Sequence, residues 1–212
     1  RDALLVQRME AAGAVLVAEF SELQGYAGAH YARLAGTAED VCQAVEEHYL
    51  PEGPDSPTPG TEAGALLAVA EKVDALVGAF AINERPTSSK DPYGLRRAAA
   101  GLVRIALERG WDLVPRTSFA ASFDAFAGQG AQLSASKDDM LDALDAFVDD
   151  RLAFHLETEG VGAESAKAAE ATAVGGLAAT ARWATAIQAS RDDTAFWAAW
   201  EACNRCVRVT AG

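Results

Sequence analysis

Residues 86–105 read PTSSKDPYGLRRAAAGLVRI, a stretch that predicts a helix with a defined start and end. Asp91 supplies an N-cap acceptor and Pro92 a first helical residue, where the missing N–H costs nothing. Gly110 follows Arg109 and predicts the C-terminal stop. At about 100° per residue, the apolar side chains share one side of the helix. They are Leu95, Ala98, Ala99, Leu102, Ile105 and Ala106.

The same region is basic within an acidic chain. From Arg85 to Arg116 there are seven Lys or Arg and three Asp or Glu, a net charge of +4. The whole chain of 212 residues carries −13, so the remainder carries −17. Arg96, Arg97 and Arg104 project within an arc of about 100° opposite the apolar side. Two interpretations remain open: a solvated face with scattered arginines, or a face that contacts phosphates.

Helical periodicity recurs along the chain. A second amphipathic stripe precedes the first and comprises Leu66, Val69, Ala70, Val73, Leu76, Val77 and Phe80. Further helices are predicted over residues 39–49, 140–156, 165–189 and 194–209. The alternation typical of strands is missing and alanine is abundant, so the sequence predicts an all-α fold. We expect the two stripes to pack together, or on a shared third helix, with Leu102 in the core.

Two segments predict breaks in this helical pattern. Pro51–Gly60 contains four prolines and two glycines in ten residues, which indicates a surface loop. Gly128-Gln129-Gly130 predicts a boundary between a domain over residues 1–130 and a helical extension over residues 131–212. From Ala131 onward there are 13 acidic and 7 basic residues, a net charge of −6.

Several motifs resemble those of the beta subunit of bacterial glycyl-tRNA synthetase. SKDPYGLRRAAAGLVRI is similar to that family's GSKDPFALRRAALGIIRI, and AEKVDALVG (residues 70–78) to its ADKLDTLVG. EFSELQGYAGAHYA (residues 19–32) resembles EFPELQGIMGYYYA, and EEHYLP (residues 46–51) matches a family hexapeptide. Residues 151–160 and 197–209 follow the family more loosely. The resemblance is dense over residues 19–109 and implies that the chain is part of a longer subunit.

The resemblance carries expectations about fold and function. It implies an HD-like helical domain over residues 1–130 that leads toward an anticodon-binding domain. In that family the alpha subunit holds the aminoacylation site with its ATP and magnesium, and the beta subunit grips tRNA in a cytoplasmic assembly of two alpha and two beta subunits. This part alone is then expected to be non-catalytic and without a cofactor. The residues expected to hold the RNA backbone are Lys90, Arg96, Arg97 and Arg104.

The HD fold also raises the possibility of a metal site, because HD phosphohydrolases hold metal ions with histidines and an aspartate pair. The sequence has no His-Asp doublet, and the family's KADL trace of one reads Met9-Glu10-Ala11-Ala12. The available ligands are scattered as His30, His48, His155 and Asp74. Asp74 is predicted to face the polar side of its helix beside Lys72, as a solvated or locally paired carboxylate. Packing against the neighbouring tyrosines Tyr31 and Tyr49 explains His30 and His48 without a metal. We therefore expect no catalytic metal.

Other features leave alternatives open. Cys203 and Cys206 cannot form a four-ligand zinc site alone, and we expect reduced thiols on a packed helix. Thr87, Ser88 and Ser89 either cap a turn or accept a phosphate at the helix N-terminus. No run is apolar and long enough to cross a bilayer. The alternatives to tRNA binding are a helical scaffold whose acidic surface binds protein, and an HD-type metal phosphohydrolase.

Overall fold

The computed structural model describes residues 23–87, 89–172 and 175–210, and within these ranges the fold is all-α, as predicted. The described part has no strand beyond one isolated bridge between Thr87 and Lys90. Its helices are α2 (Tyr26–Leu34), α3 (Glu39–Glu47), α4 (Glu62–Ala81), α5 (Leu95–Arg109), α6 (Pro115–Gly128), α7 (Lys137–Thr158), α8 (Ala163–Thr172), α9 (Leu177–Ala189) and α10 (Thr194–Thr210). The sequence did not predict α2 or α6.

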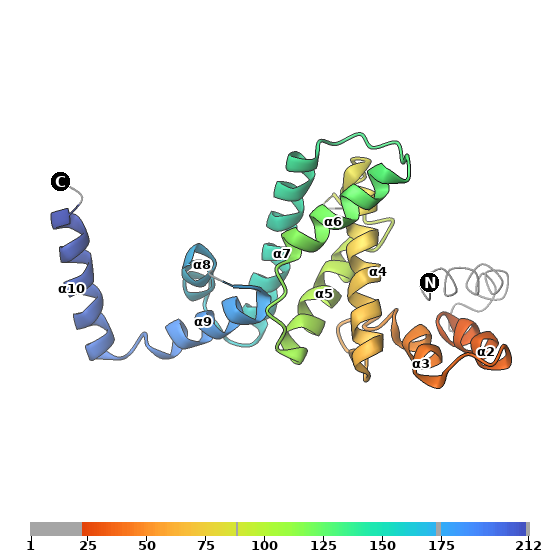
Figure 1. The fold of residues 1–212 in the computed structure, drawn as a ribbon. Helices are drawn as coiled ribbons and strands as arrows, with labels where there is room; N and C mark the ends of the chain where they lie inside the picture. The colour runs from red at the N-terminus through yellow and green to blue at the C-terminus, as the bar shows by residue number, and fades with distance from the viewer. Residues whose placement is uncertain (1–22, 88, 173–174, 211–212) are drawn as a thin grey trace.

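Helices α4, α5, α6 and α7 form the central bundle, with α2–α3 on one side and α8–α9 on the other (Figure 1). Helices α4 and α5 pack directly on each other, which confirms the predicted pairing of the two stripes. Leu76 of α4 and Leu102 of α5 are both fully buried. The same buried cluster includes Phe119 of α6 and Leu144 of α7. These side chains pack α5 into the centre of the bundle.

The buried side of α4 differs from the predicted stripe. Leu66 is 56% exposed and Ala70 is exposed, whereas Ala65 and Ala68 are fully buried. Small alanine side chains allow the neighbouring helices to approach closely, so the contact face is rotated toward them. The rotation also brings Lys72 to the buried side, where only 3% of the residue is exposed. The sequence had placed this lysine beside Asp74 on the polar side.

Helix α5 begins at Leu95, three residues later than the predicted first residue Pro92, and ends where predicted. Gly94 occupies the N-cap with φ 65°, a left-handed conformation that glycine adopts without strain. Asp91 still caps the helix, because its carboxylate accepts from the amides of Leu95 (2.8 Å) and Arg96 (3.0 Å). Gly110 closes the helix with φ 66°.

The predicted single helix over residues 165–189 is wrong. It is divided into α8 and α9, with Gly175 at φ 150° between them. A Cβ on Gly176 would lie 2.2 Å from the carbonyl carbon of Asp112, so only glycine fits against that backbone. The amide of Leu177 donates to the Leu113 carbonyl (2.9 Å), which anchors the start of α9 to the segment after α5.

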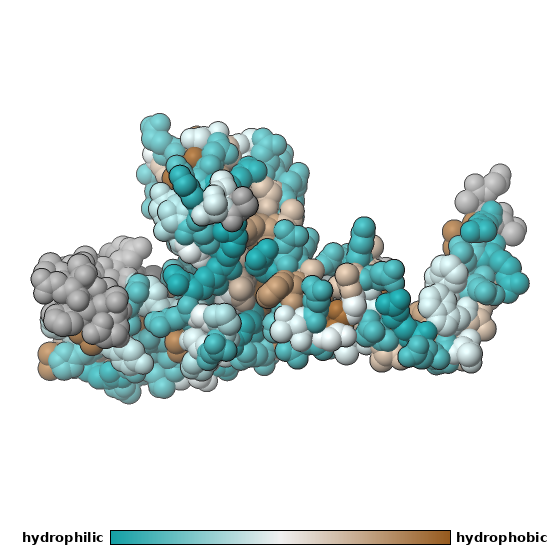
Figure 2. Space-filling view, turned by 180° about the vertical axis from the view of Figure 1, so that it is seen from behind, coloured by the Kyte–Doolittle hydropathy of each residue, from teal (hydrophilic) through white to brown (hydrophobic). Residues whose placement is uncertain are grey.

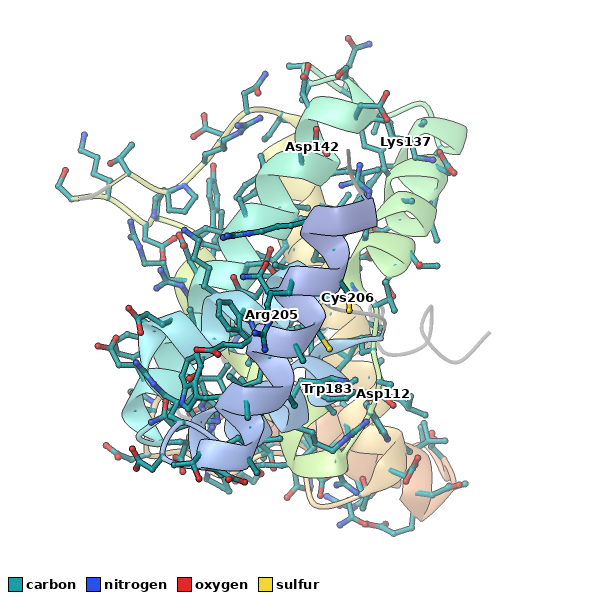
Figure 3. The ribbon with its side chains drawn as sticks, turned by 90° about the vertical axis from the view of Figure 1, so that its left-hand side faces the viewer. Asp112, Lys137, Asp142, Trp183, Arg205 and Cys206 are labelled. Atoms are coloured by element: carbon teal, nitrogen blue, oxygen red, sulfur yellow. The ribbon has the colours of Figure 1, made fainter. Side chains whose placement is uncertain are left out.

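Helix α10 stands apart from the bundle (Figure 1). The indole of Trp197 donates to the Arg191 carbonyl (2.7 Å) at the base of the helix. Farther along, Cys203 and Cys206 are exposed, so the expectation of thiols on a packed helix is wrong. This part of α10 lies away from the bundle, and Figure 3 shows the side of the molecule on which it lies, with Cys206 labelled.

The hydrophobic cluster is continuous across the predicted boundary at Gly130. It combines residues of α4, α5 and α6 with residues of α7 and α9. The mainly hydrophilic surface in Figure 2 has brown residues gathered where the bundle meets the α8–α9 arm. The division into residues 1–130 and 131–212 stays a prediction. Met9–Ala12, Glu19–Glu22 and Ser88 lie outside the described residues.

Candidate nucleic-acid interface

Arg104 lies on the outer side of α5 and binds the loop over residues 51–60. Its Nη1 donates to the carbonyls of Gly53 (3.1 Å) and Pro54 (2.9 Å), and its Nη2 to Glu108 (3.3 Å). The side chain is only 22% exposed. Arg104 therefore holds a loop, and its capacity for an external phosphate is reduced.

Arg109 acts on the other end of the same loop. Its Nη2 donates to the carbonyls of Pro59 (2.6 Å) and Thr61 (3.1 Å). Thr58 donates to Glu108 from the middle of the loop at 2.6 Å. The C-terminal half of α5 thus carries a row of side chains that fasten this loop to the bundle.

Arg96 anchors the turn that precedes α5. Its Nη2 donates to the Thr87 carbonyl (2.6 Å), and its Nη1 lies 3.9 Å from Asp91. About a third of the side chain is exposed, at 36%. Arg96 therefore keeps an outward edge while it fixes the position of the neighbouring Lys90 through the Thr87–Lys90 bridge.

Arg97 and Lys90 are exposed cations near the start of α5. The side chains of both make no hydrogen bond or ion pair with any residue that the structure describes. The Arg97 side chain folds back over the start of its own helix. Its Nη2 would lie 3.0 Å from a Cβ built on Gly94. The structure thus brings Lys90, Arg96 and Arg97 to the N-terminal end of α5. Arg104 lies about 12 Å farther along the helix axis.

A pocket of about 500 Å³ opens between α4 and the start of α5. Lys72 lies in its wall, with Nζ 3.3 Å from the His48 carbonyl and 3.6 Å from the Glu71 carboxylate. Burial lowers the pKa of Lys72, Glu71 opposes this shift, and the charge of Arg97 adds to it. Sequence reasoning placed this lysine on the polar side of α4, although its position between Val69 and Leu76 of the apolar stripe was a signal that it is buried.

The comparison with known proteins decides the family. The family described as glycyl-tRNA synthetase beta subunit matches residues 13–171, three quarters of the chain. The chain belongs to this family. The match covers α2 to α7, most of α8, and the whole basic region around α5.

Curated relatives agree with this assignment. The glycine–tRNA ligase beta subunit of Desulfitobacterium hafniense (strain DSM 10664 / DCB-2) is 39% identical over 92% of this chain and 28% of its own length. Those of Azotobacter vinelandii and Pseudomonas fluorescens (strain Pf0-1) are 45% and 46% identical over 71% and 69% of the chain, and 21% of their own lengths. The chain therefore spans less than a third of these relatives. The HD-like assignment and the link to an anticodon-binding domain stay predictions.

The residues considered as metal ligands lie apart in this beta-subunit chain. His48 is buried, with Nδ1 2.6 Å from the Val45 carbonyl and its ring 4.1 Å from that of Tyr49. His30 is exposed and contacts Tyr31 at a ring distance of 6.0 Å, as predicted. Asp74 accepts from the Ser122 hydroxyl at 2.6 Å, and His155 lies on α7. Across residues 23–87, 89–172 and 175–210, no three His, Cys, Asp or Glu side chains gather as a metal-ion site requires.

None of the described helices combines the length and the apolar character that a membrane crossing requires.

Proposed function

We propose that this chain is a tRNA-binding part of the beta subunit of glycine–tRNA ligase. It would support the ATP-dependent attachment of glycine to tRNA at an alpha subunit, in a cytoplasmic assembly of two alpha and two beta subunits. ATP and magnesium belong to the alpha-subunit site in this proposal, and the chain itself carries no catalytic residue. Membership in the beta-subunit family supports the proposal.

The observation that carries the proposal is the presence of two exposed, unpaired cations at the start of α5. Lys90 and Arg97 lie within the segment that matches the family and within the basic region of an otherwise acidic chain. Charged side chains without a protein partner remain available for phosphate oxygens. Arg96 and Arg104 complete the proposed surface. They are expected to contribute less to phosphate binding, because they already bind backbone carbonyls.

The contacts proposed here position RNA without reading its sequence, because they reach only phosphates. The net charge of −13 repels RNA at long range, so the chain alone should bind in the non-specific range of about 10⁻⁴–10⁻⁶ M. Several such surfaces acting together would supply the affinity of the complete enzyme.

The test is the double substitution Lys90→Gln and Arg97→Gln in the complete beta subunit, assembled with the alpha subunit. Loss of two phosphate contacts should lower the slope of log K against log salt by up to about two units and weaken tRNA binding. Glycine activation, measured without tRNA by pyrophosphate exchange, should be unchanged.

The matched control is Arg182→Gln with Arg191→Gln, which removes the same charge elsewhere. Both arginines are exposed and paired with surface acids, Asp112 and Glu164. This control should leave the salt slope unchanged. Equal slopes for the wild type and the Lys90–Arg97 variant would sink the proposal.

One observation favours protein binding as a second function. On α10, Trp197 is 45% exposed, Trp200 is 51% exposed and Val207 is 62% exposed. Large apolar side chains gathered on one exposed helix are typical of protein contact surfaces. If α10 binds protein while the α5 region binds no RNA, affinity for the partner should show little dependence on salt.

A further inference from the structure

The pocket between α4 and α5 combines three kinds of chemical group. Cations, carboxylates and aromatic rings meet around a volume of about 500 Å³, which is within the range of small-ligand sites. Each kind is present twice: Lys72 and Arg97, Glu52 and Glu71, Tyr49 and Tyr93. The remaining wall is built from the small residues Gly94, Ala75 and Ala98 beside Gln24 and Pro51.

Lys72 is held in the pocket wall at a cost to stability. Only 3% of the residue is exposed, yet its ionic partner Glu71 lies 3.6 Å away and is itself 37% exposed. Moving an ammonium group out of water is unfavourable unless it is well paired. The ammonium has three N–H donors, and Glu71 and the His48 carbonyl account for two. A third donor therefore remains for a group that enters the pocket.

Helix α5 has a glycine where the Lys72 side chain lies against it. Gly101 lies buried in the middle of the helix, where glycine costs about 1 kcal/mol relative to alanine. A Cβ at this position would lie 2.8 Å from Lys72 Cε and 3.3 Å from Pro51 Cδ. The glycine therefore provides the space through which the lysine side chain runs toward the pocket.

Arg97 brings a second positive charge to the same space. It is close enough to Lys72 for its charge to disfavour the ammonium form, and it has no partner among the described residues. Two like charges held together repel each other, so an anion between them would stabilise both. Phosphate oxygens suit this arrangement, because a guanidinium and an ammonium both donate several hydrogen bonds.

The two carboxylates narrow the choice of ligand. A bare phosphate would be repelled by Glu52 and Glu71, whereas hydroxyl groups beside the phosphate would donate to them. Ribose hydroxyls are bound by acidic side chains in this way at nucleotide sites. Tyr93, which is 60% exposed at the mouth, offers a ring on which a base can stack.

We propose that this pocket binds one ribonucleotide unit, with its phosphate between Arg97 and Lys72 and its ribose hydroxyls on the two glutamates. The base would lie against Tyr93. The unit comes either from a free mononucleotide or from an RNA strand, and the second source rests on the proposed tRNA-binding function.

The first experiment measures binding of the four ribonucleoside 5′-monophosphates to the 212-residue chain by calorimetry. The matching 2′-deoxynucleotides, the nucleosides and inorganic phosphate serve as comparison ligands. We expect a 5′-monophosphate to bind at least tenfold more tightly than its nucleoside and several-fold more tightly than its deoxy form. Binding no tighter than that of inorganic phosphate would overturn the proposal.

Variants assign the contacts. Arg97→Gln should weaken binding of the nucleotide at least fivefold and leave binding of the nucleoside unchanged. The control Arg182→Gln should change the affinity for neither ligand. Joint substitution of Glu52→Gln and Glu71→Gln should abolish the preference for ribose over deoxyribose. This ratio is insensitive to the loss of two negative charges, because both ligands carry the same phosphate. A preference that survives in the double variant would contradict the ribose contact, and unchanged thermal unfolding would show that each variant is folded.

A short single-stranded RNA distinguishes the two sources. If the unit belongs to a strand, the oligonucleotide should bind more tightly than the mononucleotide, compete with it and depend on Arg97. Equal or weaker binding identifies a free nucleotide as the ligand. Lys90→Gln, whose side chain does not line the pocket, tests tRNA contact alone, and the double glutamate variant tests the pocket alone. Failure of this inference and failure of the proposed function therefore give different results.

Discussion

The two ends of α5 use cationic side chains differently. At the C-terminal end, Arg104 and Arg109 donate to four backbone carbonyls of the loop and its boundary with α4. At the N-terminal end, Arg96 donates to one backbone carbonyl, but Arg97 and Lys90 make no hydrogen bond or ion pair within the described part of the chain. The same charge on the same helix thus supports the fold at one end and remains available for a ligand at the other.

The loop explains the difference. Four of the ten residues in Pro51–Gly60 are prolines, which have a carbonyl but no N–H. Such a loop has more backbone acceptors than donors, so its carbonyls need donors from elsewhere, including the partly buried ones of Gly53 and Pro59. Arg104 and Arg109 supply them. Arg97 lies in the wall of the pocket and donates to no carbonyl of this loop among the described residues.

The largest effect on stability should come from truncating the core side chain that lies between the two ends of α5. Leu102 is fully buried midway along α5, and Leu102→Ala should lower the free energy of unfolding by about 2–5 kcal/mol. Urea denaturation measures the change. Leu66→Ala is the control, because its side chain is 56% exposed and its loss should cost no more than about 0.5 kcal/mol. Equal costs would show that the assignment of the core face is wrong.

The next largest effect on stability should distinguish the C-terminal end of α5 from its N-terminal end. Arg104→Gln removes hydrogen bonds from a charged donor to two carbonyls and should cost about 1–2 kcal/mol of stability. Arg97→Gln should cost less than about 0.5 kcal/mol, because no bond to the described residues is lost. Limited proteolysis should cut the loop over residues 51–60 faster in the Arg104 variant only. Similar stability of both variants would remove the distinction between the ends.

The structure shows which parts of this fold are local enough to predict. The stop of α5 depends on Gly110 alone, and the burial of Leu102 follows from the spacing of apolar residues on one helix. Both were predicted. The division between α8 and α9 was missed because it depends on Gly176 meeting the backbone of Asp112, 64 positions earlier in the chain.

The candidate site was predictable in part for the same reason. Charge pattern located the basic region and the residues Lys90, Arg96, Arg97 and Arg104. It could not divide them by role, because the carbonyls that bind Arg104 come from a loop about 50 residues away. Lys72 was assigned to the wrong side of α4 because periodicity does not reveal that alanines set the rotation of the helix.

Lys72 offers a third test, because it lies between the two ends on the neighbouring helix. Burial lowers its pKa in the folded chain, so the unfolded chain binds more protons between the two pKa values and stability rises as pH increases toward 10.5. Lys72→Met should raise stability at pH 7 by up to about 1 kcal/mol. The gain should shrink as the pH approaches 10. Lys167→Met, at an exposed position, should show no such trend.

The smallest predicted effect extends the comparison to carboxylates on α7. Asp145 is paired with Arg116, whereas burial, followed by repulsion from Asp145 and Asp150, raises the pKa of Asp149. A raised pKa means that the folded chain binds the proton more tightly, so stability falls as pH rises from the ordinary value of 3.8 through the raised one.

Asp149→Asn should therefore stabilise the chain at pH 7 by about 0.2–0.5 kcal/mol, the size of one like-charge pair at i,i+4 spacing. The gain should disappear below pH 3.8, where both states are protonated. Asp145→Asn, four residues earlier, should destabilise the chain at pH 7 because it removes one of the two carboxylates paired with Arg116, the other being Asp142. Thermal unfolding from pH 3 to pH 7 measures both variants. Opposite signs would extend the contrast between paired and unpaired charges to a second helix, and equal signs would confine it to α5.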